Sequence, residues 1–70
     1  MTKKTFKLKG DFIKLEQLLK ATNTVSSGGD AKVLILSEQV KVNGETETHR
    51  GKKIRVSDKV ETSGTLIEVE

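Results

Sequence analysis

The stretch from Ser26 to Gly44 most constrains the fold, because it contains a helix start, a short apolar helix, a strand and a turn. Ser27 is a favourable N-cap residue. Asp30, three positions later, stands where a capping-box acid would supply a second oxygen acceptor for amides that lack partners inside the helix. The sequence therefore predicts that a helix begins near Gly28.

The same stretch predicts that this helix leads directly into a β-hairpin. Its apolar residues recur at i, i+3 and i+4, which places them on one buried stripe. These residues are Ala31, Leu34 and Ile35. Residues 40–42 then alternate as a strand does, and Asn43-Gly44 tolerates the positive φ angles of a tight hairpin turn. We expect a helix over 28–37 followed by a hairpin.

The residues before this stretch predict an edge strand and a first helix. Residues 5–9 alternate between apolar and polar side chains, which favours a strand. Asp11 is a candidate N-cap, and apolar residues recur at helical spacing from Phe12 to Thr22. The connector at 23–26 is short and polar, so the two helices must be neighbours.

The residues after Gly44 predict further strands separated by turns. Residues 45–49 alternate, and residues 53–56 alternate with Ile54 and Val56 expected to face inward. Short strands follow at Val60 and at 66–69. The expected architecture is α+β, with two packed short helices on a small twisted, mainly antiparallel sheet. The predicted core comprises Leu15, Leu18, Leu19, Ala31, Leu34, Ile35, Val40, Val42, Ile54 and Val60.

Length and composition limit the function. We expect the 70 residues to form a single domain, 1–70. A core of this size supplies about 3 to 5 kcal/mol net, which leaves little room for a catalytic cavity. There is no Cys, no signal-peptide run, and no stretch near the roughly 18 apolar residues of a membrane span. These features predict a soluble cytoplasmic protein without disulfides.

The charge is polarised along the chain, with a net charge of +3. The first twenty residues are lysine-rich, whereas residues 61–70 contain glutamates and no base. Such asymmetry is typical of a face that binds a polyanion, and also of a solubilising terminus. For Lys3 and Lys4 we favour the solubilising role.

The order of these elements resembles a known RNA-binding domain, the S4 domain, named after ribosomal small-subunit protein four. The residues that carry the resemblance are Ala31-x-x-Leu34-Ile35, Val40-x-Val42-Asn43-Gly44 and Ser57-Asp58-x-Val60. The resemblance covers Ile13 to Val60, with Lys14-Leu15-Glu16 where the family's Arg-Leu-Asp opens the first helix. The N-terminal strand and the loops at 26–29 and 50–53 resemble small stand-alone bacterial members, often labelled YaaA. The resemblance implies the alpha-L RNA-binding fold.

Three positions depart from the family pattern. Gly28 follows Ser27 where the family commonly has Ser-Arg, so a guanidinium that usually meets phosphate is missing. Glu38 stands where a helix-ending Gly is usual, and Ser57 replaces the Gly of a Gly-Asp turn. The exposed amides of Ser27, Gly28 and Gly29 at a helix N-terminus could hold an RNA phosphate instead.

The resemblance implies an RNA-binding face built from the two helices and a nearby loop. The strongest basic group lies within 50–55, with four bases and no acid. Arg50 and Arg55 suit geometry-dependent phosphate contacts better than lysines do, because a guanidinium donates two parallel hydrogen bonds. For any single base, an ordinary solvated charge is the alternative. The candidate RNA-binding residues are Lys14, Lys20, Ser27, Gly28, Gly29, Lys32, Lys41, Arg50, Lys52, Lys53 and Arg55.

The aromatic residues narrow the expected RNA target. The chain has two, Phe6 and Phe12, and both fall on predicted apolar stripes of the core. No platform for stacking unpaired bases is therefore expected, and binding would depend on the phosphates and 2′-hydroxyls of structured RNA. His49 lacks a second His or any Cys nearby, which favours an exposed, non-catalytic residue.

The sequence favours a binding module over an enzyme. It contains no nucleophile arrangement, phosphate loop or metal-ligand spacing, so no cofactor, metal or small-molecule substrate is expected. The leading hypothesis is a monomeric module that binds structured RNA, from the ribosome or another ribonucleoprotein, away from membranes. The alternative is a protein-interaction module whose basic surface is incidental. An RNA-modifying enzyme is disfavoured, because catalysis in the resembled family is carried by additional domains.

Overall fold

The computed structural model describes residues 2–70 as two helices and seven short strands. The elements are β1 (Thr2–Phe6), β2 (Ile13–Lys14), α1 (Leu15–Ala21), α2 (Gly28–Leu36), β3 (Lys41–Val42), β4 (Glu45–Thr46), β5 (Lys53–Ile54), β6 (Lys59–Thr62) and β7 (Thr65–Val69).

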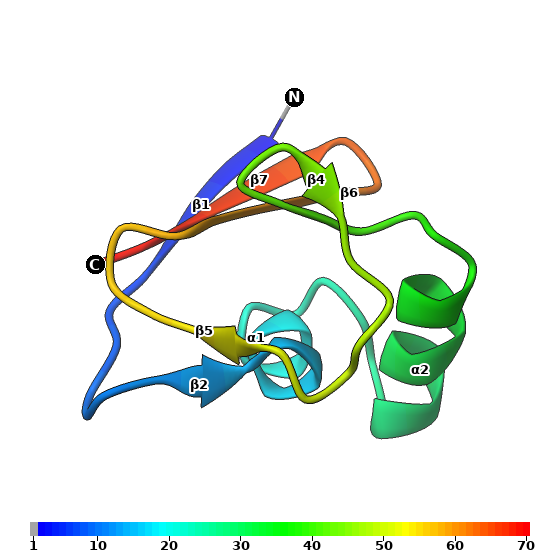
Figure 1. The fold of residues 1–70 in the computed structure, drawn as a ribbon, viewed down its shortest axis with the longest axis horizontal. Helices are drawn as coiled ribbons and strands as arrows, with labels where there is room; N and C mark the ends of the chain where they lie inside the picture. The colour runs from blue at the N-terminus through cyan, green and yellow to red at the C-terminus, as the bar shows by residue number, and fades with distance from the viewer. Residues whose placement is uncertain (1) are drawn as a thin grey trace.

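Five of the strands form one sheet in the order β1-β7-β6-β3-β4. Strand β1 pairs with β7 in parallel, and the other neighbours are antiparallel. Strands β2 and β5 form a separate antiparallel ribbon. Figure 1 shows the larger sheet at the top, α1 and the ribbon below it, and α2 at the right. The predicted α+β architecture is confirmed.

Side chains from both helices, the ribbon and the larger sheet form the core. The buried residues are Leu15, Leu18, Leu19, Ala31, Ile35, Val40, Val42, Ile54, Val60, Ile67 and Val69. Leu34 is only partly buried and packs against this cluster. The predicted core is therefore confirmed except at Leu34, and β7 contributes two members that the prediction did not include.

The stretch from Ser26 to Gly44 folds largely as predicted, because its signals are local. The Ser27 hydroxyl accepts a hydrogen bond from the Asp30 amide (3.1 Å) at the start of α2. The Asp30 carboxylate instead accepts from the Ser26 hydroxyl (2.7 Å), so only the Ser27 half of a capping box forms. At the hairpin, Asn43 and Gly44 both have positive φ angles, 52° and 88°.

The prediction of a first helix starting at Phe12 with Asp11 as its cap is wrong. Residues 13–14 form strand β2, and α1 begins at Leu15. Its first amides are capped by the chain's later loop: the Leu15 amide donates to the Lys52 carbonyl (2.9 Å) and the Glu16 amide to the Arg50 carbonyl (3.1 Å). Pairing with β5 therefore overrides the local helix signal.

The predicted edge strand exists, but it lies at 2–6 instead of 5–9. Its register is set by parallel pairing with β7, from Thr2 opposite Thr65 to Phe6 opposite Val69. Phe6 and Leu8 both pack against the core, as the alternation predicted.

Lys3 and Lys4, for which a solubilising role was expected, both lie in β1 and also contact other elements. Lys3 forms a 2.7 Å salt bridge with Glu68, and this hydrogen bond raises the pKa of Lys3 and lowers that of Glu68. The Lys4 ammonium donates to the Thr22 carbonyl (2.6 Å), which joins β1 to the end of α1.

The strands predicted over 45–49 and 53–56 are shorter than expected. Strand β4 ends at Thr46 and β5 ends at Ile54. Val56, predicted to face inward, is 54% exposed, because the chain turns at 56–57 before β6.

Two positions where the S4 pattern has Gly adopt left-handed backbone in this chain. Glu38, just after α2, has φ 62°, and Ser57 has φ 78°. A non-Gly residue is strained in this region by about 1 to 2 kcal/mol. Both positions therefore hold a conformation that Gly adopts without this strain.

We predict that Ser57→Gly stabilises the fold by about 0.5 kcal/mol. Glycine relieves the left-handed strain, although its larger unfolded-state entropy offsets part of the gain. In a domain of this size, that gain raises the melting temperature by about 2 to 4 °C. Ser37→Gly is the control, because Ser37 has φ −85° and its hydroxyl binds the Leu34 carbonyl. A lower melting temperature for Ser57→Gly would contradict the strain argument.

Candidate nucleic-acid interface

The two-stranded ribbon presents a buried side and a solvent side. Ile13 and Ile54 are paired across the ribbon and turn toward the core, with Ile54 fully buried. Lys14 and Lys53 are the other paired positions, and both are exposed. The alternation is that of a half-buried sheet.

An aromatic ring and one further cation, Arg55, complete the solvent side of the ribbon. Phe12 precedes Ile13 and is 38% exposed. The Lys53 ammonium lies 5.0 Å from the centre of its ring, and the guanidinium carbon of Arg55 lies 5.8 Å from it. We call Phe12, Lys14, Lys53 and Arg55 the ribbon face.

The exposure of Phe12 corrects the prediction that both phenylalanines belong to the core. Phe6 does pack there, whereas Phe12 follows the period-two alternation of the ribbon and faces the basic side chains. The sequence contained this signal, since Phe12-Ile13-Lys14 and Lys53-Ile54-Arg55 both alternate. Phe12 is therefore an exposed aromatic ring, contrary to the expectation that the chain offers no platform for stacking.

The bases of the ribbon face form no salt bridge within residues 2–70. Salt bridges there involve Lys3, His49 and Arg50, but none involves Lys14, Lys53 or Arg55. Like charges directly opposite each other destabilise a strand pair. The guanidinium of Arg55 has only a long hydrogen bond to a backbone carbonyl, that of Asp11 (3.4 Å). The Lys14–Lys53 pair is thus suited to an external anion.

The other two bases of the acid-free run meet carboxylates from elsewhere in the chain. Arg50 lies 3.9 Å from the Glu16 carboxylate. The charge of Lys52 contributes to lowering the pKa of Glu47. The positive charges of these two bases are therefore partly balanced by carboxylates, which the acid-free run at 50–55 did not indicate.

His49 is exposed in the loop before Arg50, as predicted, and it binds a carboxylate. Its Nδ1 lies 2.8 Å from the Glu47 carboxylate, which also accepts from the His49 amide (3.1 Å). The hydrogen bond from the His49 side chain is the main cause that lowers the pKa of Glu47, while partial burial opposes it. The His49 ring is 85% exposed.

One exposed flank of helix α2 runs from the N-terminus of the helix to the basic loop at 50–52. Gly29, Lys32 and Leu36 fall at i, i+3 and i+7, so they share one side of the helix. Leu36 lines a hollow together with Arg50 and Lys52. The predicted Ser27, Gly28 and Gly29 lie at the far end of this flank, where Asp30 adds a negative charge.

Two predicted contact residues lie outside this region. Lys41 on β3 is directly opposite Glu61 on β6, in a hollow that Glu38 also lines. Lys20 is in the last turn of α1, at the end of the helix opposite the capping loop.

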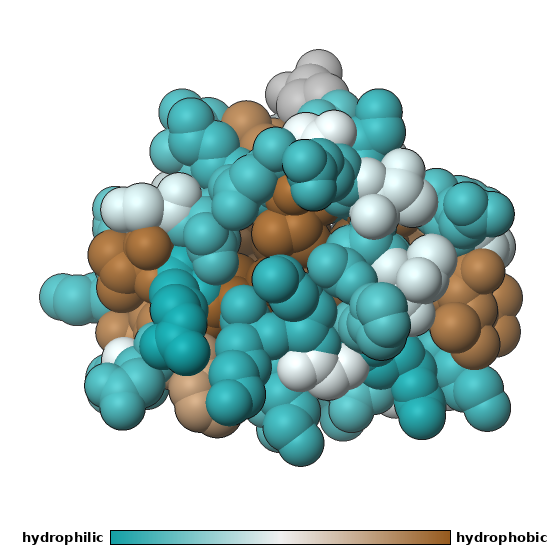
Figure 2. Space-filling view, in the orientation of Figure 1, coloured by the Kyte–Doolittle hydropathy of each residue, from teal (hydrophilic) through white to brown (hydrophobic). Residues whose placement is uncertain are grey.

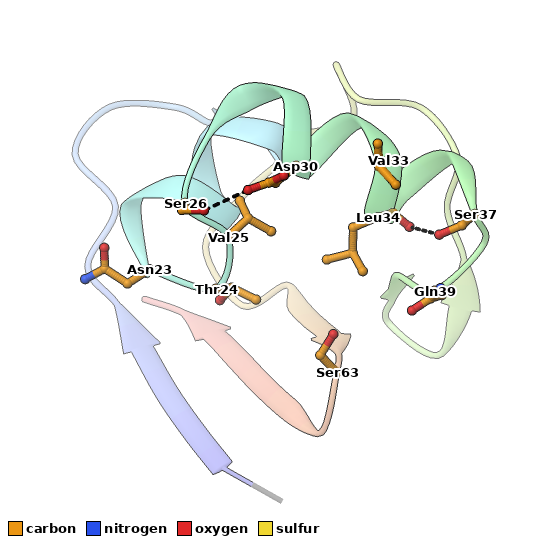
Figure 3. A pocket seen from close by; sticks show the side chains of 10 residues that line it. All are labelled: Asn23, Thr24, Val25, Ser26, Asp30, Val33, Leu34, Ser37, Gln39 and Ser63. Carbon is orange, nitrogen blue, oxygen red and sulfur yellow. Dashed lines mark hydrogen bonds between the residues drawn. The ribbon is translucent and has the colours of Figure 1, made fainter.

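The opposite flank of α2 borders a second hollow, shown in Figure 3. Its lining combines apolar, hydroxyl and amide side chains with one carboxylate and no base. The lining residues are Asn23, Thr24, Val25, Ser26, Asp30, Val33, Leu34, Ser37, Gln39 and Ser63. Val33 and Leu36 are 69% and 54% exposed, and Figure 2 shows an apolar patch over α2.

The part of the chain that the structure describes contains neither a membrane-spanning helix nor a cluster of metal ligands. Neither helix there is long and apolar enough to cross a membrane. Over residues 2–70, no three or more His, Asp or Glu side chains gather into a group that could hold a metal ion.

Comparisons with known proteins agree with this architecture. A family model described as the S4 domain matches residues 6–70. The chain is 41% identical over 54 residues to the probable ribosome maturation protein RlbA of Bacillus subtilis (strain 168), covering 77% of this chain and 76% of that protein. The solution structure of YbcJ from E. coli, described as revealing an alpha-L motif involved in RNA binding, has a TM-score of 0.73 at 38% identity, covering 93% of this chain and 84% of that one. The chain therefore belongs to the S4 domain family.

Proposed function

We propose that this chain is a non-catalytic module that binds structured RNA, and specifically ribosomal RNA during ribosome maturation. The binding surface combines the ribbon face, the 50–52 loop and the exposed flank of α2. The similarity to an alpha-L protein and to a probable ribosome maturation protein supports this proposal. Such a role would place the module in the cytoplasm, acting as a single domain.

The observation that carries the proposal is the opposed pair Lys14 and Lys53 beside Arg55. These three bases have no carboxylate partner within residues 2–70. Phosphate oxygens would supply the missing counter-charge, and release of condensed counterions would favour binding. Cellular crosslinking followed by sequencing of bound RNA tests the proposal, and recovery of no RNA would contradict it.

We predict a strong salt dependence for RNA binding. If the ribbon face, Arg50 and Lys52 together neutralise about five phosphates, log affinity falls against log salt with a slope of about −3.5 to −4.5. Doubling the salt then weakens binding about 10- to 20-fold. An electrophoretic shift assay with a folded ribosomal RNA fragment measures this slope, and a flat titration would show that the bases make no phosphate contacts.

A protein-docking module is the alternative, and one observation favours it. Val33 exposes apolar surface on α2 beside the hollow of Figure 3, and Leu36 exposes more on the other flank of the helix. Exposed apolar patches commonly mark protein contacts. Crosslinking that recovers proteins and no RNA would favour this alternative.

A further inference from the structure

Phe12 is an aromatic ring held at the surface of the ribbon. The chain contains no Trp or Tyr, and Phe6 packs against the core, so Phe12 is the phenyl ring available to a ligand. Its 38% exposure contrasts with the full burial of Ile54 on the other side of the ribbon.

The ribbon supports this ring on structured backbone. The pairs Ile13–Ile54 and Lys14–Lys53 fix the two strands, and the amides of Leu15 and Glu16 bind the loop that leads into β5. A binding group on ordered backbone loses little conformational freedom when a ligand arrives.

The cations around the ring match the chemistry of a nucleotide. The Lys53 ammonium and the Arg55 guanidinium lie 5.0 and 5.8 Å from the ring centre. An exposed cation–ring contact is weak, whereas a nucleobase stacked on the ring is held more strongly. An arriving base can therefore take the ring face while the displaced cation contacts an adjacent phosphate.

We propose that Phe12 is the stacking platform for one unpaired base of the RNA, with Lys14, Lys53 and Arg55 holding the flanking phosphates. This inference rests on the proposed RNA-binding function and specifies its ligand. One ring accepts one base, so the ligand is a structured RNA with a single extruded nucleotide, and a continuous duplex is a poorer ligand.

Fluorescence anisotropy with two labelled RNA hairpins tests this inference. The hairpins share one stem, which is fully paired in the first and carries a single unpaired adenosine in the second. The unmodified protein is expected to bind the second hairpin about 5- to 150-fold more tightly, the range associated with one stacked base. Phe12→Leu is expected to lose this preference, so that it binds the two hairpins about equally, and Phe12→Tyr is expected to retain it.

Val56→Ala is the matched control, because Val56 is another exposed apolar side chain just beyond β5. This variant is expected to keep the preference for the unpaired adenosine. Thermal unfolding verifies that each variant is folded. The affinities of the unmodified protein for the two hairpins test the proposal even if a variant fails to fold.

The outcomes separate the platform from the proposed function. Equal affinity of the unmodified protein for both hairpins would overturn the platform and leave RNA binding intact. Equal weakening of both hairpins by folded Phe12→Leu would also overturn stacking. Binding of neither hairpin at low salt would overturn the proposed function and this inference with it.

Discussion

Reversing both lysines of the ribbon, with Lys14→Glu and Lys53→Glu, is expected to weaken RNA binding by about 100-fold or more. Each change removes one attraction to phosphate and adds one repulsion, and a unit-charge pair at about 4 Å is worth at least about 1 kcal/mol. Stability should change by less than about 0.5 kcal/mol, because both positions are exposed and like charges face each other before and after the change. An electrophoretic shift assay and a urea titration measure the two effects.

The matched control is Lys7→Glu with Lys9→Glu, which also changes the net charge from +3 to −1. Both lysines are exposed between β1 and β2. Lys3 and Lys4 are unsuitable, since both bind other elements. If both double variants weakened RNA binding equally, binding would depend on the overall positive charge and not on a defined site. Normal RNA binding by the Lys14→Glu, Lys53→Glu variant would refute the site.

The elements predicted correctly from the sequence are those whose causes are local. Ser27 caps α2 through an amide three residues away, and Asn43-Gly44 turns the hairpin through its own φ preferences. The start of α1 could not be predicted in this way. Its amides are satisfied by carbonyls of Arg50 and Lys52, and no local pattern near Phe12 reveals those partners.

The candidate site was predicted in composition but not in arrangement. The acid-free run at 50–55 is visible in the sequence. Tertiary folding, in contrast, brings the Glu16 carboxylate near Arg50 and the Glu47 carboxylate near Lys52. Phe12 was placed in the core, because three alternating residues are too few to distinguish a strand from the start of a helix. Pairing of β2 with β5 turns this ring toward the basic side chains.

Truncating Ile35 to Ala is expected to destabilise the fold by about 2 to 5 kcal/mol. Ile35 lies on α2, is fully buried and belongs to the cluster that joins both helices to the sheet. The loss combines the transfer free energy of the removed methyl and methylene groups with the cost of the cavity that they leave. A core of this size supplies only about 3 to 5 kcal/mol net, so this variant should keep at most about 3 kcal/mol and is unfolded at 25 °C at the upper end of the expected loss. Circular dichroism during a urea titration measures the loss.

Two neighbouring positions on the same helix calibrate this result. Val33→Ala should leave the free energy of unfolding within about 0.5 kcal/mol of its original value, because Val33 is 69% exposed. Leu34→Ala should fall between the two, since Leu34 is partly buried against the core and also lines the hollow of Figure 3. If all three variants unfolded at the same urea concentration, the side of α2 that carries Ile35 would not be packed in the core. A graded series would instead show that the stability of α2 follows the burial of its side chains, and that its exposed flank is free to serve binding.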